Sequence, residues 1–148
     1  MLFRSDLDRK LLLIKPINWA QNSLLLLILS LWLGVFLKLK YFQQLDFYDA
    51  LSIGALTKSV ILGEQVYRIA ASYFLHLNNI HISMNILSLA LFGQFLLRVV
   101  DLYRFLCILL LSAFLASLLT LMLSPYEAII GASGGIMGVF GAYCCLRL

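Results

Sequence analysis

Long apolar runs, interrupted at a few points by polar residues, dominate the hydrophobic pattern of this chain. Four of these runs approach or exceed the roughly 20 residues that a helix needs to cross a bilayer. They cover residues 22–38, 69–97, 102–123 and 129–148. Lys38 and Lys40 close the first run, and their long side chains can reach back to the membrane surface. The pattern predicts an all-α, polytopic transmembrane helix bundle.

Two further segments complete the expected organisation. Residues 41–68 mix aromatic side chains with scattered charges, a composition typical of a loop that rests in the membrane interface. Residues 1–21 begin with too many charges for a cleavable signal peptide, and the apolar run that follows is long enough to span. We expect residues 1–21 to be a cytoplasmic N-terminal segment and residues 22–148 to form one membrane domain.

Composition excludes a soluble protein. The 148-residue chain is 63% hydrophobic and 12% charged, about half the charged fraction of a soluble domain. Its net charge of +4 comes from basic residues that flank the apolar runs, so they indicate topology rather than nucleic-acid binding. Seven of the 11 lysines and arginines fall on the side of the two chain ends. We therefore expect a multi-pass protein with both ends in the cytoplasm, in a plasma or bacterial inner membrane.

Polar residues gather in the second run, at His76, His81 and Asn85. His81 and Asn85 are one helical turn apart, so they can direct two donors to one point. On a regular helix His76 lies about 140° from His81 and faces elsewhere. Taken alone, the pair also fits hydrogen bonds that join neighbouring helices. We expect no metal and no cofactor, because asparagine is a poor zinc ligand and the three cysteines lack zinc or disulfide spacing.

A serine among small residues stands near the start of the fourth run, in the sequence Gly131-Ala132-Ser133-Gly134-Gly135. Polar groups at membrane depth are functional candidates by default. A helix start also offers backbone N–H groups that have no partner within the helix. A serine nucleophile beside donors that converge on a developing oxyanion is what acyl transfer requires.

The two clusters together resemble the rhomboid family of intramembrane serine proteases. That family carries G-x-S-G at the start of its fourth core helix and H-x-x-x-x-H-x-x-x-N on its second. Both motifs are intact here, at residues 131–134 and 76–85. Upstream, residues 63–68 read G-E-Q-V-Y-R, similar to the family's G-E-x-W-R with Tyr67 in place of tryptophan. The resemblance covers about residues 51–143 and implies that four spans of a six-helix core are present.

The resemblance implies a role for each matching residue. Ser133 is the nucleophile, and its backbone N–H together with the side chains of His81 and Asn85 holds the oxyanion. Substrates are transmembrane helices of other membrane proteins, cut near their outer ends. The remaining matches are structural, because they order the first loop, form a hydrogen bond near the top of the second helix (His76), or let the fourth helix pack closely. They are His76, Glu64, Arg68, Gly131, Gly134, Gly135 and Gly138.

One part of the family's machinery is missing from this sequence. In rhomboids the general base is a histidine on the sixth helix, whereas the two histidines here are His76 and His81. We therefore expect a fragment that is inactive alone. The alternative is a non-catalytic rhomboid-like protein that binds transmembrane clients. A transporter requires intramembrane charges, and a G-x-S-x-G hydrolase requires a soluble α/β fold; the sequence favours neither.

Overall fold

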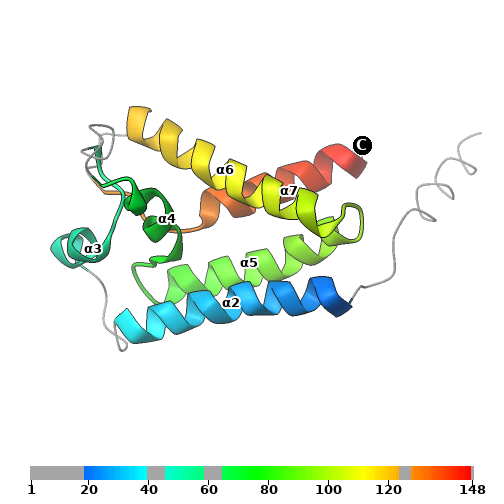
Figure 1. Cartoon of the computed structure of the whole chain (residues 1–148), viewed down its shortest axis with the longest axis horizontal. Helices are drawn as coiled ribbons and strands as arrows, with labels where there is room; N and C mark the ends of the chain where they lie inside the picture. The colour runs from blue at the N-terminus through cyan, green and yellow to red at the C-terminus, as the bar shows by residue number, and fades with distance from the viewer. Residues whose placement is uncertain (1–18, 40–45, 59–64, 124–127, 148) are drawn as a thin grey trace, which may run out of the picture.

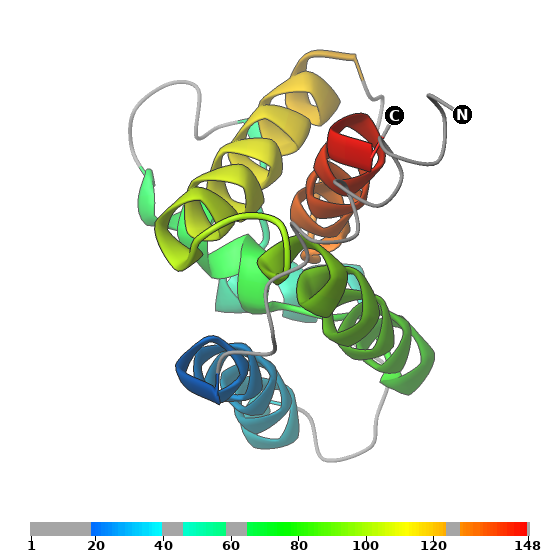
Figure 2. The same cartoon turned by 90° about the vertical axis from the view of Figure 1, so that its right-hand side faces the viewer.

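The computed structural model describes residues 19–39, 46–58, 65–123 and 128–147. Their six helices are α2 (Trp19–Leu39), α3 (Phe47–Ile53), α4 (Tyr67–Phe74), α5 (Asn79–Leu97), α6 (Leu102–Leu123) and α7 (Ser133–Arg147). Helices α2, α5, α6 and α7 form a bundle, and the short α3 and α4 lie at one end of it (Figures 1 and 2). The prediction of an all-α fold is confirmed for these residues.

Two of the described helices, α5 and α6, are long and apolar enough to cross a membrane. α6 coincides with the predicted third span. α2 has 21 residues and covers the predicted first span. α7 has 15 residues. The first and fourth spans therefore remain predictions.

The predicted second span, residues 69–97, is divided into α4 and α5 by a connection at residues 75–78. Asn78 closes this connection with an extended backbone, and its side-chain oxygen accepts a hydrogen bond of 2.8 Å from the N–H of His81. Such an N-cap satisfies an amide that the helix itself leaves unpaired. The premise of a regular helix from His76 to His81 is therefore wrong.

The fourth apolar run does not become helical at its start. Ile129 instead pairs with Leu56 in an isolated antiparallel bridge, with N–H···O distances of 2.8 and 3.0 Å. The helix begins only at Ser133. This bridge joins the segment at residues 46–58 to the segment that leads into α7.

Glycines let α6 and α7 approach closely, and this pair makes the most extensive helix contact in the fold. A Cβ atom added at Gly134 would overlap Ala116, and one added at Gly138 would overlap the side chain of Ser112. Gly141, further along α7, has no neighbouring atom within 4 Å of its Cβ position. The close approach of α7 to α6 is therefore located at Gly134 and Gly138.

This packing also sets the depth at which α7 begins. Gly134 faces Ala116, which lies seven residues before the end of α6 at Leu123. At about 1.5 Å per residue, α7 starts roughly 10 Å inward from that end of α6. Figure 1 shows the same offset, since the orange start of α7 lies part-way along α6.

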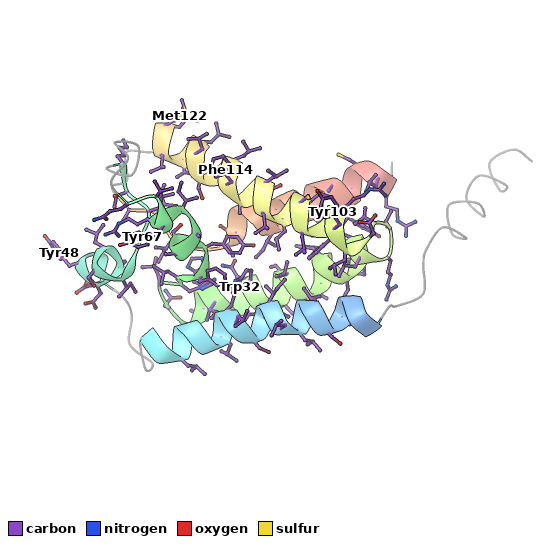
Figure 3. All side chains as sticks on the ribbon, in the orientation of Figure 1. Trp32, Tyr48, Tyr67, Tyr103, Phe114 and Met122 are labelled. Carbon is purple, nitrogen blue, oxygen red and sulfur yellow. The ribbon has the colours of Figure 1, made fainter. Side chains whose placement is uncertain are left out.

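The core lies where the helices of the bundle meet. Its fully buried members come from every long helix and include Trp32, Leu89, Phe105 and Val139. Trp32 points from α2 toward the other helices (Figure 3). This tryptophan also contacts the buried ring of His76.

We predict that Gly138→Val destabilises the fold by about 1–3 kcal/mol, because the added side chain must displace Ser112 on α6. Gly141→Val is the matched control on the same helix, where the side chain meets open space, and its effect should stay within about 0.5 kcal/mol. Denaturant-induced unfolding in detergent micelles, followed by circular dichroism, measures both. Equal destabilisation by the two variants would show that α6 and α7 are not closely packed at Gly138.

Candidate active site

Ser133 is the first residue of α7, and its side chain is exposed. The segment that carries it turns at Gly131, whose φ of +108° belongs to the region that glycine adopts without strain. The Gly131 N–H donates a hydrogen bond of 2.9 Å to the carbonyl oxygen of Ser72, a buried residue of α4. The serine is thus held at a helix start by a fixed turn.

Gly131 also lies directly against the polar residues of α5. A Cβ atom at Gly131 would lie 2.8 Å from both Cε1 and Nε2 of His81 and 3.9 Å from Nδ2 of Asn85. A separation of 2.8 Å is shorter than the contacts that real Cβ atoms make, so only glycine fits beside the His81 imidazole. The structure therefore brings His81 and Asn85 together at a point two residues before Ser133.

Asn85 supplies an unused donor at this point. The residue is 6% exposed, and its Nδ2 is buried with no hydrogen-bond partner among the described residues. A buried polar group without a partner costs free energy, so it calls for a functional explanation. The side-chain amide of Asn85 and the Nε2 edge of His81 both border Gly131. This arrangement places the Asn85 amide donor and the Nε2 edge of His81 beside a helix start.

His76 lies closer to this cluster than the sequence predicted. Its ring is 1% exposed and stands edge-on to the ring of His81, with centroids 5.1 Å apart. The expectation that His76 faces away from His81 is wrong, because the break at residues 75–78 places His76 outside the helix. Its Nδ1 lies 3.3 Å from the carbonyl oxygen of Phe74, which can only accept, so Nδ1 carries the proton.

The charge state of His76 follows from its surroundings. Burial, with a smaller contribution from repulsion by His81, disfavours the charged form of this imidazole. The imidazole is therefore neutral at physiological pH. With the proton on Nδ1, its Nε2 is an acceptor.

Arg68 organises the segment at the end of the bundle. Its Nη1 donates to the carbonyl oxygens of Leu51 and Ala55, at 2.7 and 2.9 Å, and its Nε donates to the side chain of Gln65. These bonds hold the turn next to Leu56, the residue that pairs with the segment before Ser133. Glu64, predicted to share this role, lies outside the described residues.

Sequence reasoning missed two aromatic residues near the site. Trp32 of α2 packs edge-on against Tyr73 of α4, with centroids 5.4 Å apart, and lies 5.7 Å from the ring of His76. The Tyr73 oxygen is 3.0 Å from the Cβ position of Gly135. Both residues sit within apolar runs and match no motif, so the sequence gave no local signal for them.

A cavity of about 470 Å³ lies between α2, α4 and α6 and is almost entirely apolar. Trp32 and Tyr73 line it, whereas Ser133, His81 and Asn85 do not. It is therefore separate from the polar cluster. The part of the chain that the structure describes contains no group of three histidine, cysteine or acidic residues that could bind a metal.

Comparison with known proteins identifies the family of the chain. Residues 63–148, more than half of the chain, match the Rhomboid domain. The chain is 33% identical over 91 residues to RHOMBOID-like protein 6, mitochondrial, of Arabidopsis thaliana. That match covers 61% of this chain and 30% of the relative. No solved structure matches. The chain is a membrane protein that belongs to the rhomboid family.

Proposed function

We propose that this chain carries the nucleophile and the oxyanion-binding groups of an intramembrane serine endopeptidase. The observation that carries the proposal is the contact of Gly131 with His81 and Asn85, two residues before an exposed serine at a helix start. Membership of the rhomboid family supports it. The substrates would be transmembrane helices of other membrane proteins.

The proposed reaction is acyl transfer. The Ser133 oxygen attacks a backbone carbonyl carbon of the substrate while a base removes the hydroxyl proton. Negative charge then develops on the carbonyl oxygen, which accepts hydrogen bonds from the Ser133 N–H, Asn85 Nδ2 and His81 Nε2. The C–N bond breaks, the amine leaves with the proton, and water hydrolyses the acyl-serine. The donors are worth most at membrane depth, where the dielectric is low.

The position of Ser133 limits which substrates can react. The serine lies roughly 10 Å inward from the end of α6, within the apolar part of the bundle. A helical substrate hides its carbonyl groups in hydrogen bonds, so it must unwind locally, and helix-breaking residues ease this. Met137 is exposed one turn after Ser133, so the same face of α7 is available to a neighbouring helix.

The proposed reaction also needs a general base. The two histidines of the chain are His76 and His81. Nδ1 of His76 is engaged with Phe74, and His81 faces Gly131. We propose that further spans of a longer protein supply the base. The same observation favours the second candidate, a rhomboid-like protein that binds transmembrane helices without cutting them.

We predict that Ser133→Ala, in the protein expressed from the whole gene, reduces cleavage of a model transmembrane substrate by at least about 10⁵-fold, because a catalytic unit fails when its nucleophile is removed. Ser83→Ala is the matched control, since Ser83 is exposed on α5. Cleavage is followed on gels after reconstitution into liposomes. Substantial cleavage by Ser133→Ala would contradict the assignment, whereas binding of the substrate without cleavage by the wild-type protein would favour the second candidate.

We also predict that Asn85→Ala lowers kcat by about 10²–10³-fold with little change in KM, because the donor acts on charge that exists only in the transition state. Ser88→Ala, one turn further along α5, should leave kcat within about twofold of wild type. Steady-state kinetics in detergent measures both variants. If Asn85→Ala raised KM and left kcat unchanged, the residue would bind substrate rather than the oxyanion.

A further inference from the structure

Five buried side-chain polar atoms of the described residues have no hydrogen-bond partner. Besides Nδ2 of Asn85 and Nε of Arg98, they are Nε1 of Trp32, the hydroxyl of Tyr73 and Nε2 of His76. Trp32 and His76 are 0% and 1% exposed. Their rings are in contact, with centroids 5.4 Å apart for Trp32 and Tyr73 and 5.7 Å apart for Trp32 and His76. Trp32 contacts both other rings, so the three unpaired polar atoms lie on neighbouring side chains, here called the Trp32–Tyr73–His76 cluster.

Such atoms are rarely left unpaired in folded proteins. A buried donor or acceptor without a partner loses its hydrogen bonds to water and gains none in return. Buried groups that find no protein partner are usually bonded to ordered water, which typically makes two to four hydrogen bonds. One water molecule therefore has enough hydrogen bonds to serve all three atoms of this cluster.

The chemistry of the three atoms fits water and disfavours an ion. Trp32 Nε1 can only donate, which excludes a metal cation as its partner. His76 Nε2 can only accept, because Nδ1 donates to Phe74, and a lone pair repels an anion. The Tyr73 hydroxyl can do either. A water molecule can accept from Trp32, donate to His76 and bond to Tyr73 at the same time.

We propose that Trp32, Tyr73 and His76 bind one buried water molecule that fixes the position of the serine-bearing segment. Two contacts lead from this cluster to that segment. The ring of His76 abuts His81, whose ring abuts Gly131. The Tyr73 oxygen lies 3.0 Å from the Cβ position of Gly135.

The two glycines flank Ser133 at equal distances along the chain. Tyr73 and His76 are therefore positioning residues, which act through the backbone on either side of the serine. The water site concerns the packing of the fold, so it holds whether or not the protein cleaves substrates.

Nitrogen-15 NMR of the histidine side chains in detergent micelles tests the proposal. In Trp32→Phe and in Tyr73→Phe, loss of one partner weakens the water site. The Nε2 resonance of His76 should then move toward that of an imidazole nitrogen that accepts no hydrogen bond. Tyr143→Phe is the matched control, because Tyr143 stacks on Phe95 in α5 and should leave the resonance unchanged.

Movement of the resonance in only one of the two variants would indicate a direct hydrogen bond between two rings and would overturn the proposal. An unchanged resonance in both variants would also overturn it. If a variant does not fold, the wild-type protein provides a second measurement. The indole proton of Trp32, distinguished from that of Trp19 by Trp19→Phe, should show a nuclear Overhauser effect with the sign of tightly bound water. An effect of the opposite sign, or none, would also overturn the proposal.

Discussion

The contact between Gly131 and the imidazole of His81 is the constraint on which the rest of the site depends. It requires a residue without a Cβ and with a positive φ, and both requirements fall on the same glycine. The Gly131 N–H is fixed to Ser72 at the same time. Because these restraints act two residues before α7, they determine where the helix begins and where Ser133 stands.

Close packing of α6 and α7 determines how far Ser133 lies inward from the end of α6. Small residues on α7 allow the helix to start opposite Ala116, seven residues before the end of α6, rather than level with that end. The segment before it is then extended at a depth where unpaired backbone groups are costly. Ile129 avoids this cost by pairing with Leu56, and Gly131 by bonding to Ser72. Arg68 in turn holds the chain next to Leu56.

The sequence predicted most of the fold because continuous apolar runs reveal long helices. The third predicted span coincides with α6, and the first falls within α2. The break between α4 and α5 was not predicted, because a hydrophobic pattern does not show the hydrogen bond by which Asn78 caps His81. The late start of α7 depends on Ile129 pairing with Leu56, a partner distant in sequence.

The candidate residues His81, Asn85 and Ser133 could be predicted from sequence because each of the two motifs that carry them is local. The contacts of Trp32 and Tyr73 could not be predicted from sequence, because they join separate helices.

The central claim is that the segment before the serine rests on His81. Its most direct test is the nuclear Overhauser effect between the Gly131 Hα protons and the His81 Hε1 proton in micelles. A strong cross-peak is predicted; its absence, with both resonances assigned, would contradict the account.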